Sequence, residues 1–501
     1  MLSAAPGIDP NRIFSDFRLA DRDAVIAAVS GGSDSLALLF LLKAFLDAQA
    51  LTPRLIAVTV DHGLRTESAR EAETVAAICG KAGIEHRIAR WTGAKPASGV
   101  SAAAREARYR LLADAAMLEG TDIILTGHTL DDQIETVAMR AERGDGRGLA
   151  GMARATLYGG RVWILRALLG ARRAELRQWL GARAVVWIDD PTNIDEKYER
   201  ARLRGARERP PETSQPASSR ASAGGSEGQS GVQDAEQVQS EIVRAAARRI
   251  ALGERAADLI RAHARVAVPG LVSLDRAFAQ ASDKRAASYA LRMLLAVLGG
   301  KEQLPDLARS AALFDHLGQT RHRATLSRTV VDVRRAGVFL YRERRGLPQP
   351  MLLGGELNWD GRYRIEAPEQ AGQMLLAPFG DDSARRAELP AADAPESLVR
   401  LALACQPAVH PVERAASQRM PALLPITTRR REGAATFATR SHASPGEREG
   451  EWAAAVAIPI LAPWARFLPS FDLAAAGAVA MLLGTEQPPE PPFAGHNARG
   501  G

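Results

Sequence analysis

The chain has 501 residues, of which 46% are hydrophobic and 25% charged, a balance typical of a globular protein that excludes a fibrous or wholly disordered one. A single core stops growing at about 250–300 residues, so the length predicts two or three domains. The net charge of +7 suits a polyanionic partner. Arginine far outnumbers lysine, however, a bias that a GC-rich genome also produces, so charge alone does not establish nucleic-acid binding.

Two further features of the sequence indicate the cellular compartment of the protein. The only cysteines are Cys79 and Cys405, which are far apart and argue against a disulfide scaffold or a cysteine-based metal site. No apolar run reaches the roughly 18 residues of a membrane span, and the first residues lack the pattern of a secretory signal. We therefore expect a cytoplasmic protein without a membrane partner.

Strand-like and helical patterns alternate over residues 1–204. The strand-like runs lie at 25–29, 55–60, 86–90, 122–126, 162–165 and 184–189. The helical patterns lie at about 35–49, 67–83, 101–119, 131–141 and 172–181. The strands are apolar nearly throughout, as expected when helices cover both faces of a sheet. We predict a parallel, doubly wound α/β domain that binds its ligands at the carboxyl ends of the strands.

The rest of the chain has a different pattern. Residues 205–233 are predicted to be a disordered linker or insert, because 209–231 contain no large apolar or aromatic residue. Apolar residues then recur every three or four positions, which predicts a helical domain over 234–320. We expect a mixed α/β region over 321–490, with strands at TVVDV and VFLYRE, a hairpin at GGELNWDGRYRIEA and a short final helix. Within this region, residues 427–451 are rich in Arg, Thr, Ser, Glu and Gly, and we expect them to be loosely structured.

The strongest chemical signal follows the first strand. It consists of Ser30, Gly31, Gly32, Ser33, Asp34 and Ser35. The glycines let the backbone approach a ligand, and the next helix presents free N–H groups to an anion. The serine hydroxyls are further donors to phosphate. A carboxylate at Asp34 makes sense if Mg²⁺ links it to the phosphates. The alternative is a simple turn with a helix cap, but we favour an ATP-phosphate site.

This loop is not of the Walker type, because no lysine follows the glycines. It resembles the pyrophosphate loop of the N-type ATP pyrophosphatases, the PP-loop superfamily. The resemblance implies an adenine nucleotide α-hydrolase-like fold. It also implies a common reaction, in which an acceptor oxygen attacks the α-phosphate of ATP, pyrophosphate leaves, and a nucleophile then displaces AMP.

Five other motifs narrow the resemblance. They are VDHGLR (60–65), REARY (105–109), TGHTLDDQIET (126–136), RGDGRGLAGM (143–152) and DDPTN (189–193). Their order and spacing resemble the tRNA(Ile)-lysidine synthases over about 24–204, and only thinly afterwards. This implies ATP-dependent ligation of free L-lysine to carbon 2 of the wobble cytidine in tRNA(Ile) with a CAU anticodon. The reaction passes through an adenylated cytidine and releases AMP and pyrophosphate. The C-terminal region would help to grip the tRNA.

The expected site residues follow from these motifs. Arg105 and Arg108 share a helix face, and we expect them to neutralise the phosphates, although a solvated face is the alternative. Asp131 and Asp132 are candidates for capping a helix or for holding or deprotonating the lysine amine. His128 is a candidate phosphate donor. His62 is placed in the ATP-binding pocket, with a capping or buried role equally open.

Basic residues in the motif 143–152 and near the end of the predicted α/β domain are expected to bind tRNA. They are Arg143, Arg147, Arg200, Arg202 and Arg204. Backbone phosphates give RNA binding a large electrostatic component, but a solvated linker edge remains the alternative. The sequence has Ala201 where the family commonly has asparagine, which puts the local tRNA contact in doubt.

Three rival functions differ in what they require. A 2-thiolation enzyme of the same superfamily needs clustered cysteines, which the sequence lacks. A glutamine-dependent synthetase needs a partner domain with a catalytic cysteine. A non-catalytic RNA-binding relative would have lost the SGGSDS or DD motif, and both are intact.

Overall fold

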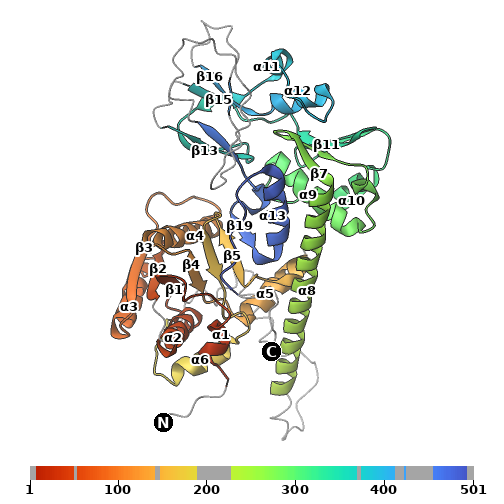
Figure 1. The fold of residues 1–501 in the computed structure, drawn as a ribbon. Helices are drawn as coiled ribbons and strands as arrows, with labels where there is room; N and C mark the ends of the chain where they lie inside the picture. Colours follow the sequence, from red (N-terminus) through yellow and green to blue (C-terminus); the bar gives the residue numbers. More distant parts are fainter. Residues whose placement is uncertain are drawn as a thin grey trace, which may run out of the picture. The chain divides into compact units, whose positions relative to one another are not determined.

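The computed structural model describes residues 7–49, 53–141, 147–188, 227–368, 374–411, 422–424 and 455–493. The chain forms two compact units, one of Met1–Arg249 with Glu490–Gly501 and one of Ile250–Pro489 (Figure 1). The division between them falls within α8 (Glu227–His263). This helix begins inside the segment predicted as a linker, and the rest of that segment lies outside the described residues. No described helix is long and apolar enough to span a bilayer.

The first unit is built on a twisted, mostly parallel sheet. Its strands are β1 (Ala24–Ala28), β2 (Arg54–Asp61), β3 (Glu85–Arg90), β4 (Ile123–Thr126), β5 (Ala155–Tyr158) and β6 (Val162–Leu165). They are arranged in the order β5-β6-β4-β1-β2-β3, and only β5 is antiparallel to its neighbour in this series. The strand order reverses direction beside β1, which is where such sheets bind ligands. The predicted doubly wound α/β fold is confirmed.

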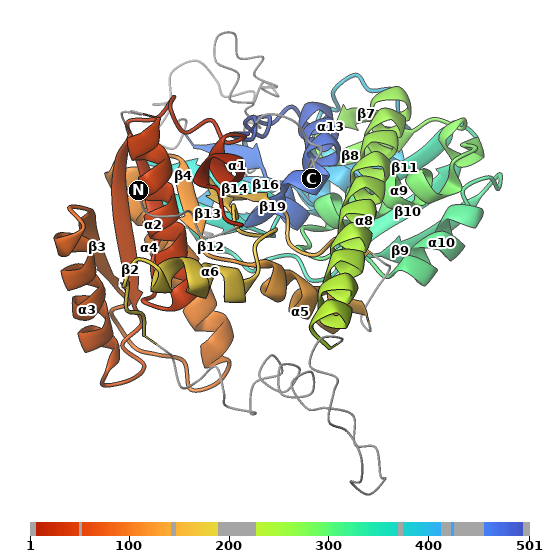
Figure 2. The ribbon, with the colours of Figure 1, turned by 90° about the horizontal axis from the view of Figure 1, so that it is seen from below.

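Helices cover both faces of this sheet. They are α1 (Pro10–Phe14), α2 (Ser33–Ala48), α3 (Ser68–Lys81), α4 (Val100–Leu118), α5 (Leu130–Ala141) and α6 (Arg173–Gly181). Ile26 and Val58 pack with Leu112 of α4 on one face. Side chains alternate along a strand, so the intervening residues of β1 face α2 on the other side. Figure 2 brings α2 and α6 to the front.

The strand predictions for this unit were wrong for one segment and missed another. The predicted strand 184–189 is not one where it is described, because residues 185–188 have no regular structure. Val186 is 79% exposed, and the backbone N–H of Ile188 donates to Gly31 O instead of to a neighbouring strand. Strand β5 was missed. It forms a hairpin with β6 through Gly159 and Gly160, which both have positive φ.

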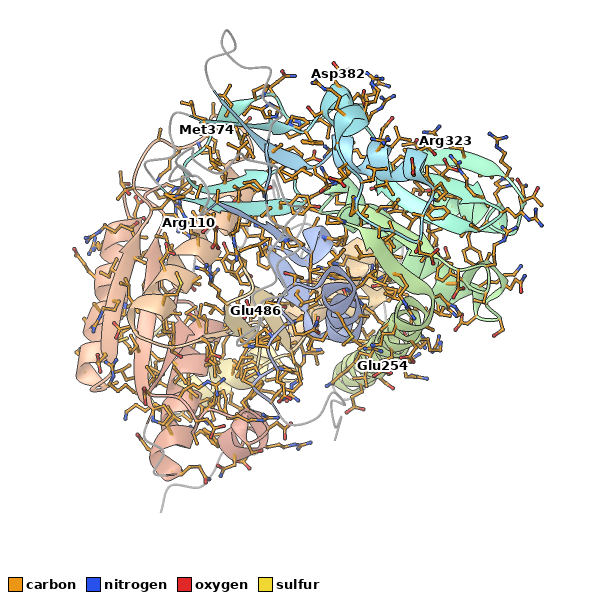
Figure 3. All side chains as sticks on the ribbon, turned by 45° about the horizontal axis from the view of Figure 1, so that its top comes forward. Arg110, Glu254, Arg323, Met374, Asp382 and Glu486 are labelled. Carbon is orange, nitrogen blue, oxygen red and sulfur yellow. The ribbon has the colours of Figure 1, made fainter. Side chains whose placement is uncertain are left out.

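The second unit contains an antiparallel sheet packed on a buried helix. Its strands β7 (Ala264–Val268), β8 (Leu271–Leu274), β9 (His322–Leu326), β10 (Thr329–Arg334) and β11 (Gly337–Arg342) run in the order β7-β8-β11-β10-β9. The helix α9 (Lys284–Gly299) contacts β10 and β11, and α10 (Leu307–Asp315) follows. The region 234–320 is therefore not wholly helical. Arg323 (Figure 3) lies on the outer strand β9 and donates to Tyr341 Oη at 2.9 Å.

Shorter elements complete this unit. They are β12 (Met351–Leu352), β13 (Gly355–Trp359), β14 (Tyr363–Ala367), β15 (Met374–Pro378), α11 (Asp381–Arg386), α12 (Glu396–Ala404), β16 (Pro407–Pro411), β17 (Ala422–Leu423), β18 (Val456–Pro459), β19 (Phe467–Pro469) and α13 (Leu473–Leu483). The predicted hairpin is confirmed as β13–β14, the strands at TVVDV and VFLYRE as β10 and β11, and the final helix as α13. The segment 427–451 lies outside the described residues.

A buried charge cluster holds the turn of that hairpin. Asp360 has φ of 59° and Gly361 of 70°, as expected for a type I′ turn. The Asp360 carboxylate accepts from Arg342 Nε at 3.0 Å and Arg362 Nε at 2.7 Å, and it also pairs with Arg328. The side chains of Asp360 and Arg342 are 1% and 0% exposed. One buried carboxylate thus forms ion pairs with three guanidinium groups.

Candidate active site

The SGGSDS segment forms a tight loop between β1 and α2. Gly31 has φ of 89°, and a Cβ there would lie 2.9 Å from Ile188 Cδ1, so the position favours glycine. The Ser35 hydroxyl accepts from Ser30 N at 3.1 Å and donates to Gly32 O at 3.0 Å. Ser35 therefore holds the shape of the loop from within. The N-terminus of α2, beginning at Ser33, remains the feature that attracts an anion.

The HTLDD segment meets this loop at the same edge of the sheet. Strands β1 and β4 are parallel neighbours, with Ala28 paired to Thr126. Their carboxyl ends therefore lie side by side. The approach is close, because a Cβ on Gly127 would lie 2.8 Å from Asp34 O and 3.0 Å from Ser35 Cα. The two strongest sequence motifs form one site.

Gly127→Ala is expected to disrupt this site by pushing β4 away from α2. The added methyl would meet backbone atoms that cannot move aside, and such overpacking costs about 1–3 kcal/mol. We expect a measurable fall in the free energy of unfolding together with weaker ATP binding, followed by chemical denaturation and equilibrium binding. Gly181→Ala is the matched control, since a Cβ there meets nothing within 4 Å. Equal free energies of unfolding and equal ATP affinities for the two variants would contradict the close contact between Gly127 and the backbone of α2.

An arginine that sequence reasoning missed lies at the centre of the site. Arg173 donates from Nε to Asp34 Oδ2 at 2.7 Å and from Nη2 to Asp132 Oδ1 at 3.2 Å. Its backbone N–H donates to Asp131 Oδ2 at 2.8 Å. One turn later on α6, Arg177 Nε donates to Ser33 Oγ at 3.2 Å. Helix α6 therefore ties the SGGSDS loop to the HTLDD segment.

A sequence signal for Arg173 did exist. Arg172 and Arg173 stand at the start of a predicted helix, where the helix dipole disfavours positive charge. Such a pair is stabilised by carboxylates nearby in the fold. Asp131 supplies one, accepting from Arg173 N and pairing with Arg172 Nη2 at 3.3 Å.

The two aspartates predicted as alternatives have different partners. Asp132 Oδ2 accepts from Thr129 N at 2.9 Å and from Thr129 Oγ1 at 3.1 Å, which caps α5. Its other oxygen faces Arg173, so Asp132 joins Asp34 around one guanidinium. Asp131 instead fixes the start of α6.

Burial raises the pKa of Asp34 above its ordinary value, and the nearby Arg173 charge only partly offsets this effect. A carboxylate in this state gains from a further cation. The oxygen donors of Asp34 and Asp132 are of the kind that Mg²⁺ prefers. No group of three or more His, Cys, Asp or Glu able to hold a metal occurs among the described residues. Phosphate oxygens and water would have to complete any coordination, as is usual for Mg²⁺.

The predicted histidines lie at the same edge. His128 Nδ1 is 2.9 Å from Thr126 Oγ1. His62 follows β2, and its buried Nδ1 has no hydrogen-bond partner among the described residues. Burial lowers the pKa of His62, and the charge of Arg108 lowers it further. His62 therefore favours the neutral imidazole.

The predicted arginines of α4 do not contact the loop. Arg105 is exposed and lies with its Cζ 5.0 Å from the ring centroid of Tyr109. Arg108 is half-buried, and burial lowers its pKa. Within the described part of the chain, no hydrogen bond or ion pair joins either one to residues 30–35. Their predicted role at the phosphates stays a prediction.

The RGDGRGL loop is described only from Arg147 onwards. Gln133 clamps the end of this loop, donating to Met152 O at 3.0 Å and accepting from Met152 N at 2.6 Å. Arg140 Nη1 donates to Gly151 O at 3.0 Å. These contacts position Arg147 beside α5. The other predicted tRNA contacts, Arg143, Arg200, Arg202 and Arg204, lie outside the described residues.

Comparisons with known proteins agree with this site. Residues 10–207 match the family model described as a PP-loop domain. The tRNA(Ile)-lysidine synthase of Mesorhizobium japonicum is 45% identical over 99% of this chain and 100% of its own length. That of Rhizobium meliloti is 41% identical over 68% of this chain and 73% of its own length.

A solved structure was also matched, the U34-tRNA thiolase NcsA from Methanococcus maripaludis with its [4Fe-4S] cluster. It is 20% identical with a TM-score of 0.32, and the match covers 36% of this chain and 65% of that one, too little to carry an argument. The full-length relative, the PP-loop match and the joined motifs are decisive. The chain belongs to the tRNA(Ile)-lysidine synthase family and is an ATP-dependent ligase with an N-terminal PP-loop domain.

Proposed function

We propose that the chain joins free L-lysine to carbon 2 of the wobble cytidine of tRNA(Ile) with a CAU anticodon. The observation that carries this proposal is the meeting of the SGGSDS loop and the HTLDD segment around Arg173. One edge of the sheet thereby offers an anion-binding helix terminus, two acidic groups and a guanidinium. These are the groups that nucleotidyl transfer followed by amine attack requires.

The first step is adenylation of the cytidine. Its oxygen on carbon 2 attacks the α-phosphate of ATP, and the bond to pyrophosphate breaks. The loop amides and the N-terminus of α2 receive the leaving pyrophosphate, while Arg177, which donates to Ser33 Oγ, offsets its charge. Asp34 and Asp132 would hold Mg²⁺, which when bound supplies further neutralisation of the phosphate charge.

The second step replaces AMP by lysine. The ε-amine must be neutral to attack, and its reference pKa is near 10.4. We assign Asp132, rather than Asp131, to holding or deprotonating the amine. Support comes from the place of Asp132, which lies with Asp34 around Arg173 beside the phosphate loop, whereas Asp131 binds the start of α6. The amine nitrogen bonds to carbon 2, the bond from carbon 2 to the AMP oxygen breaks, and the amine proton passes to the base.

The tRNA contacts remain proposals. Arg143, Arg147, Arg200, Arg202 and Arg204 are assigned to phosphates near the reacting base. The division into a PP-loop domain, a largely helical region over 234–320 that also carries β7 and β8, and a tRNA-binding region over 321–490 also stays a proposal, as does the cytoplasmic location.

The thiolation alternative is not favoured. Sulfur transfer by cysteine needs a thiolate, which is formed most readily at exposed, electropositive positions. Both Cys79 and Cys405 are buried, and burial raises the pKa of each to about 11. Neither side chain is suited to that chemistry.

Incubation with ATP, labelled lysine and a panel of tRNAs tests the proposed function. We expect lysine-dependent label only on the isoleucine tRNA with a CAU anticodon, together with one AMP and one pyrophosphate for each lysine. Methionine tRNA, which also has a CAU anticodon, is the specificity control. Label on no tRNA, or transfer of sulfur in place of lysine, would refute the assignment.

A further inference from the structure

A tryptophan ring and a lysine ammonium lie at the carboxyl ends of β2 and β3. Asp61 and Arg90 are paired at the ends of these strands. His62 and Trp91 come next, and Trp91 N donates to Asp61 O at 2.9 Å. The two rings meet edge to face, with centroids 6.3 Å apart and planes at 88°. The cluster therefore stands on the ligand edge of the sheet, beside the strand that carries the phosphate loop.

The indole of Trp91 is half-buried and carries a cation on its face. Lys95 Nζ lies 4.0 Å from the ring centroid. A ring face that attracts an ammonium in this way also accepts a planar base. A base that took the place of Lys95 Nζ on the ring face would bring this ammonium close to the neighbouring phosphate of the nucleic acid.

The ammonium on Trp91 has no acidic partner. Among the described residues, no carboxylate forms an ion pair with Lys95, whereas the nearby Arg90 pairs with Asp61 at 3.9 Å. Arg173, in contrast, is neutralised by Asp34 and Asp132. The neighbouring cluster is thus poised for an anionic ligand.

We propose that Trp91 is a stacking platform for an unpaired base of the tRNA anticodon loop, with Lys95 contacting an adjoining phosphate. This inference rests on the proposed function, because the reacting cytidine must reach the nucleotide at the end of β1. Bases next to it in a single-stranded loop then pass over the ends of β2 and β3. Aromatic faces joined to cationic side chains are the usual means of binding single-stranded RNA.

The charge distinguishes this ligand from the adenosine end of ATP. The phosphates of ATP are accounted for at the N-terminus of α2, and adenosine itself carries no charge. The ammonium of Lys95 would have no charge to neutralise beside adenosine. A polynucleotide backbone supplies a phosphate at each nucleotide, so RNA matches the observed charge better.

Equilibrium binding by the full-length chain tests this surface, with a CAU anticodon stem-loop RNA and ATP as separate probes. Trp91→Ala is expected to weaken RNA binding about tenfold or more while leaving the Kd of ATP unchanged. Trp91→Phe retains a stacking face and should recover most of the loss. Recovery by phenylalanine separates stacking from a general effect on folding.

The salt dependence of RNA binding tests the role of Lys95 independently. Lys95→Ala is expected to reduce the slope of log K against log salt by about 0.7, the value for one phosphate contact on a single strand. Lys81→Ala is the matched control. It removes the same charge from an exposed position at the end of α3, where the chain turns back to enter β3 at its amino end.

Two results would overturn the inference. One is a loss of ATP affinity in Trp91→Ala with RNA binding intact, which would assign the ring to adenosine. The other is unchanged RNA binding in both Trp91→Ala and Lys95→Ala. Because binding is measured without turnover, RNA binding through Trp91 with no lysidine formed would refute only the proposed function.

Discussion

Asp34→Ala is expected to abolish pyrophosphate release while leaving tRNA binding nearly intact. The carboxylate lies in the first turn of α2, beside the phosphate loop, and shares Arg173 with Asp132. Loss of one preorganised electrostatic group at a reacting centre typically costs about 10²–10³-fold in kcat, which brings pyrophosphate release close to background. Stopped-time assays of pyrophosphate release, with tRNA binding measured in parallel, give the comparison.

The fold should tolerate this change. Burial raises the pKa of Asp34, so the charged carboxylate is not in a favourable site without a bound cation. Asp47→Ala is the matched control on the same helix, where an exposed carboxylate pairs with Lys43 Nζ at 2.9 Å. Wild-type turnover by Asp34→Ala would show that the loop has been assigned wrongly. Equal losses in both variants would point to damage to α2.

Asp360→Asn is expected to destabilise the second unit by about 3–5 kcal/mol, the usual cost of leaving buried charges without their partner. Asparagine has the same shape and tolerates positive φ, so the turn at Asp360 is retained and only the charge is lost. Burial already lowers the pKa of Arg342, and Asp360 is the anion that offsets it. Urea denaturation of the full chain measures the effect.

Asp258→Asn provides the comparison for this second variant. Asp258 is 74% exposed and pairs with Arg261 at 2.8 Å, so its charge should contribute little. Similar unfolding midpoints for the two variants would contradict the view that Asp360 anchors the hairpin β13–β14.

The inner strands of the first unit were predictable because helices cover both of their faces. Such strands are continuous apolar runs, as in β1, β4 and β6, whose residues are all buried. The edge strand β3 is partly exposed, and five of the six predicted strands were found, as β1, β2, β3, β4 and β6. The sixth failed for a physical reason. The run AVVWID has the composition of a strand, but Ile188 packs on the phosphate loop and its N–H bonds to Gly31 O. Composition does not reveal which partner a backbone donor will find.

The strands of the second unit were only partly predictable. The run ARVAVPGLVSL lies directly after the long helix α8 and forms the hairpin β7–β8 around Gly270, which has φ of 78°. Its Pro-Gly pair between apolar runs was a turn signal. The strong helical periodicity on either side outweighed it, so 234–320 was interpreted as entirely helical.

The active site was also only partly predictable from the sequence. The loop, Asp131, Asp132 and both histidines were found by motif, but Arg173 was not. It acts on Asp34, which is 139 positions away in the chain, and on Asp132, 41 positions away. Only the fold brings these groups together. The arginine pair at a helix start was the one local sign, because the helix dipole opposes it.

The central claim is that the SGGSDS loop and the HTLDD segment form one nucleotide site. Crystallography of the chain with Mn²⁺ in place of Mg²⁺ and an ATP analogue that resists α,β cleavage tests it most directly. We predict an anomalous peak for Mn²⁺ within coordination distance of the Asp34 carboxylate, and the terminal phosphates at the N-terminus of α2. A triphosphate bound at the opposite end of the strands, or a metal that contacts neither Asp34 nor Asp132, would contradict the account.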